Sequence, residues 1–316
     1  MNSLQESAGS KFILMGEHFI VHGGVPALSF PILSKKTFVE QSIKETSKFS
    51  LSCKSYFLSD EKEISQPLVA KAMEKAIHLI IKEFDAVDFF RNKTLQVVSK
   101  SQIPVSRGFG SSASFSVALS KATAATLGQS ITRKELEKHV MTLEKLFHGN
   151  PSGVDAATVL SETPIRFENG KVTRKLNNSA VDFIILDSGD RKGCAELVTK
   201  VSKRRDENKK EWLQFADALK DLVDECETAL DRGDYATVAK AVTENHGILQ
   251  ELNLSTPEIN SIISTAKKHG ALAGKVSGAG AGGAVVIVCK KGEAHRVADS
   301  LKEKNYKILA VEESFS

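Results

Sequence analysis

The sequence predicts a globular protein of mixed helices and strands, divided into two parts. Short apolar runs bounded by glycine or proline indicate strands. Longer segments with apolar side chains every three or four positions indicate helices. The second half is rich in helices with few strands, so we expect a soft domain boundary near residue 175, after the turn FENGKV. A chain of 316 residues accommodates one large or two medium domains.

The first half alternates strands with helices. The patterns predict strands at residues 12–15, 37–42, 48–57 and 94–99, and helices at residues 68–84, 112–127 and 134–147. The last helix carries Leu136, Val140, Leu143 and Phe147 along one side, which predicts a buried stripe. The loop HGNPSG follows it.

The second half continues mostly as helix. The patterns predict strands at residues 181–186, 284–289 and 307–311, and helices at residues 195–232, 235–252 and 293–303. A further helix is expected to start at STPE, residues 255–258, and to run to residue 269. A capping hydroxyl, an early proline and an acidic residue in the first turn are typical of such a start.

Composition excludes several classes of protein. Hydrophobic residues make up 41% of the chain and charged residues 26%, as in ordinary soluble proteins. A net charge of +4 suits an anionic ligand without requiring a nucleic acid. The basic run KVSKRRDENKK contains acidic residues and no stacking aromatics, so it is interpreted as a solvated helix face.

We expect a cytoplasmic protein without a membrane anchor. The four cysteines form no CxxC pair, which argues against disulfides and zinc and fits a reducing compartment. No apolar run approaches the roughly 20 residues of a membrane span. The polar N-terminus is unlike a signal peptide.

The stretch PVSRGFGSSAS, residues 104–114, resembles a loop that holds an anion. Its glycines let backbone N–H groups approach a ligand, and the helix that follows adds its positive end. No lysine makes it a Walker A loop, and Ala113 stands where a dinucleotide-binding loop has its third glycine. The alternative is a glycine turn with a serine N-cap. A second glycine cluster, KVSGAGAGG at residues 275–283, is either another anion loop or a tight turn between a helix and a strand.

Four segments in this order resemble the GHMP family of small-molecule kinases: SKFILMGEHFIVHGG, PVSRGFGSSAS, HGNPSGVD and KVSGAGAGG. The resemblance covers nearly the whole chain. It implies a two-lobed α+β fold, with a ribosomal-protein-like, ATP-binding N-terminal lobe over residues 1–175. A ferredoxin-like C-terminal lobe would follow over residues 176–316, with the active site between the lobes.

Within the family, GEHFIVHG, HGNPSGVD and LSTPEI are most similar to members that act on mevalonate. The resemblance therefore implies ATP- and Mg²⁺-dependent phosphorylation of the mevalonate 5-hydroxyl, giving 5-phosphomevalonate and ADP for isoprenoid synthesis. Those members commonly carry a basic residue and Ser-Thr where this chain has Lys192-Gly193-Cys194, within DSGDRKGC. Another acceptor, such as phosphomevalonate, a related hydroxy acid or a sugar, therefore stays open. A homodimer is one option for the assembly.

The resemblance assigns catalytic and metal-binding roles to four side chains. Asp155 would be the catalytic base, and the alternative is an N-cap of a short helix. Lys11 would stabilise that carboxylate and lower the pKa of the alcohol, and the alternative is a solvated lysine. Ser112 and Glu144 would ligate Mg²⁺, with Ser111 the other candidate hydroxyl. The alternative for Glu144 is a surface charge that pairs with a lysine or with His148. Their joint presence argues against a non-catalytic nucleotide-binding protein.

The resemblance also assigns binding residues. Glu17 and His18 would line the acceptor side, and Ser152 and Gly153 would shape the acceptor loop. Gly278, Ala279 and Gly280 would approach the acceptor or the transferring phosphate through backbone N–H groups. The ATP phosphates would lie against Pro104, Gly108, Phe109, Gly110, Ser111, Ser112 and Ala113. Arg107 and His22 receive no role.

Overall fold

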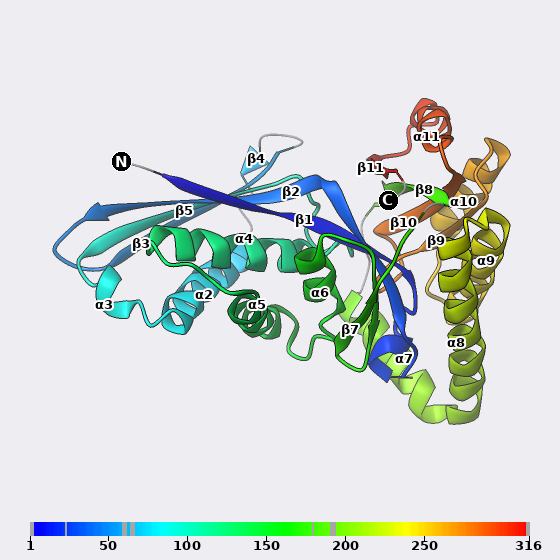
Figure 1. Ribbon diagram of the computed structural model, residues 1–316, viewed down its shortest axis with the longest axis horizontal. Coiled ribbons are helices and arrows are strands. Elements are labelled where there is room, and N and C mark those ends of the chain that lie inside the picture. The colour runs from blue at the N-terminus through cyan, green and yellow to red at the C-terminus, as the bar shows by residue number, and fades with distance from the viewer. Residues whose placement is uncertain are drawn as a thin grey trace. The chain divides into compact units, whose positions relative to one another are not determined.

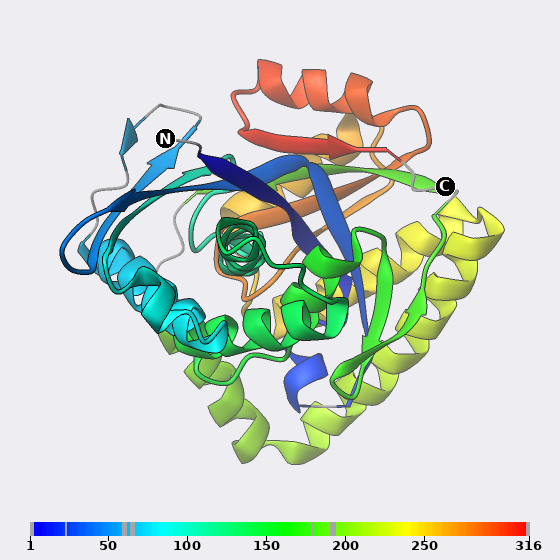
Figure 2. The same cartoon turned by 60° about the vertical axis from the view of Figure 1, so that its left-hand side comes forward.

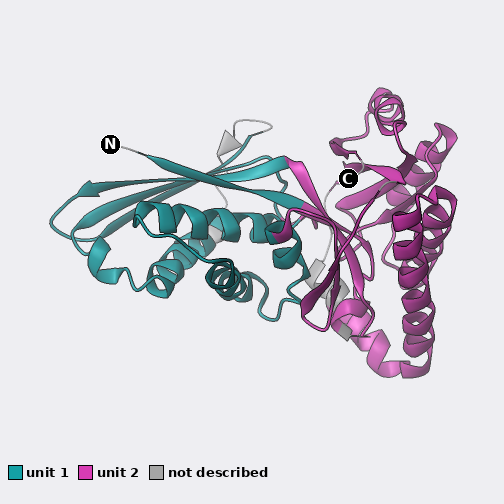
Figure 3. Cartoon of the chain, viewed as in Figure 1, with its two compact units in different colours: residues 1–10, 35–105, 110–160 teal, residues 11–34, 106–109, 161–316 magenta. Residues whose placement is uncertain are grey.

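The structure is a computed structural model that describes residues 3–22, 24–58, 62–63, 67–178, 180–189 and 194–313. The chain forms two compact units that interleave along the sequence (Figure 3). Unit 1 comprises Met1–Ser10, Lys35–Val105 and Gly110–Leu160, and unit 2 comprises Lys11–Ser34, Ser106–Phe109 and Ser161–Ser316. The single boundary near residue 175 stays a prediction, whereas the expected two-part α+β fold is confirmed.

The elements follow one another as Figure 1 labels them. The strands are β1 Leu4–Met15, β2 Ala27–Glu45, β3 Ser50–Phe57, β4 Lys62–Glu63, β5 Lys93–Ser101, β6 Ile165–Glu168, β7 Lys171–Lys175, β8 Val181–Asp187, β9 Ala273–Val276, β10 Ala284–Lys290 and β11 Ile308–Glu312. The helices are α1 Phe19–His22, α2 Pro67–Glu83, α3 Val87–Phe90, α4 Ser111–Thr126, α5 Arg133–His148, α6 Val154–Ser161, α7 Cys194–Glu207, α8 Lys209–Arg232, α9 Tyr235–Glu251, α10 Pro257–Lys268 and α11 Ala294–Glu303. Over the described ranges, none of the helices is long and apolar enough to span a bilayer.

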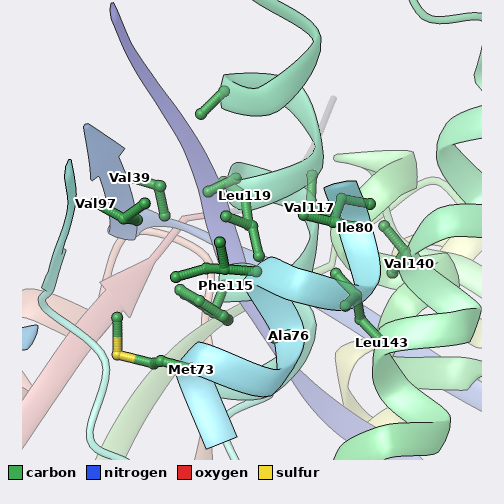
Figure 4. Close-up of a cluster of buried hydrophobic side chains, with 14 of the residues drawn as sticks. Val39, Met73, Ala76, Ile80, Val97, Phe115, Val117, Leu119, Val140 and Leu143 are labelled. Atoms are coloured by element: carbon green, nitrogen blue, oxygen red, sulfur yellow. The ribbon is translucent and has the colours of Figure 1, made fainter. Parts of the chain in front are cut away.

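Unit 1 packs helices on one face of a sheet. The larger sheet runs β4-β3-β5-β2-β6-β7, with β1 paired to β2, and β1 and β2 run through both units. In unit 1, β5 pairs antiparallel with β2 and parallel with β3. Helix α4 lies below the strands, α2 contacts β3, and α5 packs on α4 and α2 (Figures 1 and 2). Figure 4 shows the apolar contact between these layers, which buries Val39, Met73, Ala76, Ile80, Val97, Phe115, Val117, Leu119, Val140 and Leu143. This core holds α4 rigidly by its apolar sides.

Unit 2 contains a four-stranded antiparallel sheet in the order β11-β8-β10-β9. Taken in chain order the strands are arranged 4-1-3-2, as in a ferredoxin-like fold. Helices α9 and α10 pack on β9, and α8 packs on α9 (Figure 1). Phe12, Phe30 and Phe183 meet in one aromatic cluster, with centroids 5.0 to 5.4 Å apart. Contacts of this kind fix the end of β1 against β8.

Several sequence-based expectations about the elements were wrong. The strand predicted at residues 37–42 is the longer β2, which begins at Ala27. Strand β1 begins at Leu4 rather than at residue 12, because its polar first half is a half-exposed strand paired to β2. The long helix predicted at residues 195–232 is broken at Asn208, whose side chain accepts from the Glu211 N–H and caps α8. The FENGKV turn joins two paired strands that were missed, β6 and β7. Its Asn169-Gly170 pair has positive φ at both residues, the usual signal of a two-residue hairpin.

Candidate active site

The N-terminus of α4 has no side-chain cap among the described residues. Gly110 is the N-cap residue, at φ 71°, and Ser111 and Ser112 are already inside the first turn. The serine-capped turn considered from the sequence is therefore wrong. The first turn also contains no acidic residue. Backbone N–H groups at such an end attract an anion, and the dipole of a 16-residue helix adds to that attraction.

A hydroxyl, a carboxylate and an imidazole lie together beside this helix end. Glu144, on α5, is only 2% exposed. Its Oε2 accepts from the Ser112 hydroxyl at 3.2 Å, and its Oε1 accepts from the Ser116 hydroxyl at 3.2 Å. The Ser112 Oγ also lies 2.8 Å from Nε2 of His148, one turn after Glu144. The surface position considered for Glu144 is wrong, because two hydroxyls hold its carboxylate in a buried position. The pairing with His148 that was considered with it is present, with 3.8 Å between His148 Nε2 and Glu144 Oε2.

Asp155 lies in the first turn of α6, as the second residue of that helix. The N-cap position considered for Asp155 from the sequence is wrong, because the residue lies inside the helix. The helix begins directly after Gly153, which has φ 91°, and the Val154 N–H donates to Ser152 Oγ at 3.4 Å. Ser152 and Gly153 thus shape the start of α6, and their role toward an acceptor stays a prediction. The side chain of Asp155 is half-buried.

The first glycine-rich loop can meet a ligand mainly through its backbone and its serines. Pro104, Phe109 and Ala113 are buried, and Phe109 is 0% exposed. The Phe109 carbonyl accepts from the Lys11 N–H at 3.2 Å. Gly108 has φ 92°, a conformation that favours glycine. Among the residues expected to contact ATP, Pro104, Phe109 and Ala113 are therefore buried in the protein. The side chains of Ser111 and Ser112 are only half-buried.

A buried ion pair joins Glu17 to Lys275. Glu17 follows β1 and is 1% exposed, and Lys275 lies in β9 and is 0% exposed. Nζ of Lys275 pairs with Oε1 of Glu17 and donates to the Val276 carbonyl at 2.8 Å. Burial raises the pKa of Glu17 and lowers the pKa of Lys275, so each group keeps its charge only through its partner. Lys275 therefore occupies one oxygen of the Glu17 carboxylate, which is not fully available to a ligand.

The second glycine-rich loop connects β9 to β10, two paired strands, so its interpretation as a helix-to-strand turn is wrong. Ser277 fixes it to β1, because the Ser277 hydroxyl accepts from the Ile13 N–H and donates to the Ile13 carbonyl, each at 2.9 Å. Nε2 of His18 lies 3.2 Å from the Ala279 carbonyl, and only an N–H can donate there. His18 therefore holds this loop through its ring.

The conformation of the same loop depends on glycine. Gly278, Gly280, Gly282 and Gly283 all have positive φ. A Cβ on Gly280 would lie 2.6 Å from the Leu254 carbonyl oxygen. Several residues of the loop thus have positive φ, and the loop lies close to Leu254 at Gly280, so its backbone has little freedom to rearrange.

Arg107 lies in unit 2, with NH1 3.8 Å from Oδ1 of Asp187. The same oxygen accepts from the Gly189 N–H at 3.1 Å. Arg107 is therefore part of a contact at the end of β8, a place the sequence did not indicate. Arg191 and Lys192 of DSGDRKGC lie outside the described residues, as does the side chain of His22.

Sequence reasoning missed Ser116, Lys275 and Ser277, and it considered His148 only as a charge partner of Glu144. Two of them carried a usable signal. His148 stands four residues after Glu144, so it shares a helix face with it. Lys275 interrupts the buried strand AGKV, and a lysine in such a strand requires a partner.

The donor set at α4 and α5 fits magnesium. Mg²⁺ prefers oxygen ligands and usually keeps several waters and substrate phosphates in its shell. Glu144 and Ser112 supply a carboxylate oxygen and a hydroxyl oxygen within contact of each other, beside a helix end suited to phosphate. In the part of the chain that the structure describes, no group of three or more His, Cys, Asp and Glu forms a complete metal cage.

An uncapped helix end beside an oxygen-donor pair, within a two-part α+β fold, is a site suited to phosphoryl transfer. The sequence profile of the GHMP kinases N terminal domain matches residues 69–162, and that of the GHMP kinases C terminal domain matches residues 226–307. The chain belongs to the GHMP kinase family, and it is an enzyme with kinase function.

Three relatives show how far the similarity extends. The chain is 29% identical to the mevalonate kinase of Pyrococcus furiosus, over 88% of this chain and 86% of the relative. The crystal structure of L. major mevalonate kinase in complex with R-mevalonate superposes with a TM-score of 0.82 and 24% identity, covering 98% of this chain and 95% of the other. The crystal structure of the Methanococcus jannaschii mevalonate kinase superposes with a TM-score of 0.78 and 25% sequence identity. The superposition covers 100% of this chain and 99% of the other.

Proposed function

We propose that this enzyme transfers the γ-phosphoryl group of ATP to the 5-hydroxyl of mevalonate, giving 5-phosphomevalonate and ADP in isoprenoid precursor synthesis. The observation that carries the proposal is the buried Glu144 carboxylate, held by Ser112 beside the uncapped end of α4. The relatives with mevalonate kinase names support the choice of acceptor. We expect the reaction in the cytoplasm.

In unit 1, the backbone at the start of α4 and the Ser111 hydroxyl would bind phosphate oxygens. Ser112 and Glu144 would hold Mg²⁺, which when bound neutralises charge that develops on the transferred phosphate. Asp155 would accept the proton of the attacking hydroxyl. The start of α6 fixes the backbone of Asp155, so the carboxylate needs little ordering when substrate binds.

In unit 2, Lys11 would supply positive charge that favours the ionised form of the alcohol. Its backbone is held by the Phe109 carbonyl, and its side chain is 2% exposed. Glu17 would accept a hydrogen bond from the acceptor alcohol, and the loop fixed by His18 and Ser277 would present backbone N–H groups to it.

The test is coupled ADP release by the purified enzyme with ATP and Mg²⁺. Acceptors offered separately are mevalonate, phosphomevalonate, a related hydroxy acid and several sugars. The proposal expects mevalonate to give the highest kcat/KM. ADP release at background with mevalonate, together with turnover of another alcohol, would reassign the acceptor and leave the kinase chemistry in place.

A further inference from the structure

Lys275 is the most deeply buried cation of unit 2 that the proposed chemistry leaves without a task. Its side chain is 0% exposed in β9, a strand whose other residues are alanine, glycine and valine. A lysine is rarely buried without a charged partner, because desolvation opposes its charge. The partner here is Glu17, 258 positions away in sequence.

The contact fixes one side of the Glu17 carboxylate. Lys275 Nζ pairs with Oε1, and the Val276 carbonyl takes another of its N–H groups at 2.8 Å. The ammonium is thereby anchored to the backbone of its own strand, so Oε1 has one defined position. A charge-assisted hydrogen bond of this kind is among the stronger ones in proteins.

The second oxygen of Glu17 has no such partner. Among the described residues, nothing hydrogen-bonds to the buried Oε2 of Glu17. A buried carboxylate oxygen without a donor is unusual, and it is most often explained by a ligand or by water. Burial raises the pKa of Glu17, and the charge of Lys11 opposes this rise by a smaller amount than Lys275 does, so the proposed catalytic lysine is within electrostatic reach of the same carboxylate. Glu17 is thus linked to one lysine by contact and to another by charge.

We propose that Lys275 is a positioning residue for the acceptor alcohol, holding Oε1 of Glu17 so that Oε2 accepts a hydroxyl of the bound acceptor. The inference rests on the proposed function for the identity of that acceptor. Lys275 acts through Glu17 and touches neither ATP nor the reacting atoms. A purely structural ion pair would stabilise the fold equally well and would leave acceptor binding unchanged.

A double-variant cycle separates these two roles. The proteins are the wild type, Glu17→Gln, Lys275→Met and the combined variant. Lys290→Met, on an exposed position of the neighbouring strand β10, is the matched control for loss of one positive charge. Each protein is assayed for kcat, for KM of the acceptor and of ATP, and for the rise in Tm on adding acceptor or nucleotide alone.

We expect Glu17→Gln and Lys275→Met each to raise the acceptor KM by about 10- to 100-fold, with the ATP KM within about twofold. The acceptor-induced rise in Tm should disappear, while the nucleotide-induced rise remains. The combined variant should have the acceptor KM of Glu17→Gln alone. Multiplying effects, or an unchanged acceptor KM in Lys275→Met, would overturn the inference.

The experiment still tests the inference if Lys275→Met folds poorly. The combined variant buries no unpaired charge, so it is expected to fold even where Lys275→Met does not. The acceptor KM of the combined variant is then compared with that of Glu17→Gln. Equal values support a role of Lys275 through Glu17, whereas a further rise in the combined variant indicates an independent role of Lys275. A wild-type enzyme inactive with mevalonate contradicts the proposed function, and the same cycle is then run with whichever alcohol the ADP screen identifies.

Discussion

The Ser112 hydroxyl donates to the Glu144 carboxylate at 3.2 Å, which joins the first turn of α4 to the last turns of α5. Ser112 Oγ lies 2.8 Å from His148 Nε2 as well. A hydroxyl has one hydrogen, so its bond to Glu144 leaves Nε2–H of His148 as the donor on the other side. The oxygen proposed as a metal ligand is therefore oriented by two neighbours before any ion binds.

The metal-binding proposal predicts a change in the magnesium requirement. Glu144→Gln keeps the shape of the side chain and one acceptor oxygen but loses the negative charge. The Mg²⁺ concentration for half-maximal rate should rise by about tenfold or more. Titration of activity with Mg²⁺ at saturating ATP measures it. An unchanged requirement would remove Glu144 from the metal site.

The same titration decides between the two serines. Ser112→Ala is expected to raise the Mg²⁺ requirement, because it deletes the hydroxyl beside Glu144. Ser111→Ala should instead raise the ATP KM and leave the Mg²⁺ requirement unchanged. The opposite pattern would make Ser111 the ligand.

Loss of the Asp155 carboxylate should affect turnover rather than folding. Asp155→Asn is isosteric and keeps α6 intact, but the amide cannot take the hydroxyl proton. We expect kcat to fall by about 10²- to 10⁴-fold with an unchanged Tm. Asp88→Asn, a change of an exposed acid of unit 1, is the control. Near-normal kcat in Asp155→Asn would exclude a role as the base.

Two glycines with nearly the same positive φ provide a matched stability test. Gly280 has φ 85° and no space for a Cβ, whereas Gly292 has φ 84° and open space around it. Gly292→Ala should cost about 1 kcal/mol from the left-handed conformation alone. Gly280→Ala should cost about 3 kcal/mol, because the clash with Leu254 is added. Urea unfolding measures both, and equal losses would show that the loop relaxes.

His246 predicts an acid-dependent loss of stability. Burial, with a smaller effect of Lys275, lowers the pKa of this histidine from 6.5 to about 4, against a hydrogen bond with Asn260. The unfolded chain then binds a proton that the folded protein does not. The free energy of unfolding should therefore fall as the pH drops from 6.5 toward 4, by about 3 kcal/mol in total.

The control for this prediction is His246→Gln, whose amide can still reach Asn260 but does not titrate in this range. The free energy of unfolding of His246→Gln should decrease less on acidification than that of the wild type. Identical acid dependence in the two proteins would assign the effect to other groups.

The sequence by itself determined the elements with strong local patterns. The stripe of the helix at residues 134–147 and the cap and proline of α10 depend on neighbours a few positions away, and the structure confirms both helices within one or two residues. The order of the four motifs likewise sufficed for the family, and the profile matches confirm it. The metal-binding role expected of Glu144 came from the resemblance to this family rather than from a local pattern.

Only the tertiary structure decided which groups share an environment. The partners in the Glu17–Lys275 pair and the Ser277–Ile13 contact are more than 250 positions apart, so no local pattern encodes them. The start of α4 was also decided by packing. Phe109 enters the core and Gly110 takes a left-handed turn, which leaves the serines inside the helix rather than at its cap. Residue types and their order indicate phosphate chemistry. Which side chains can take part also depends on burial and on long-range pairing, because the desolvation of a charged group depends on all the residues packed around it.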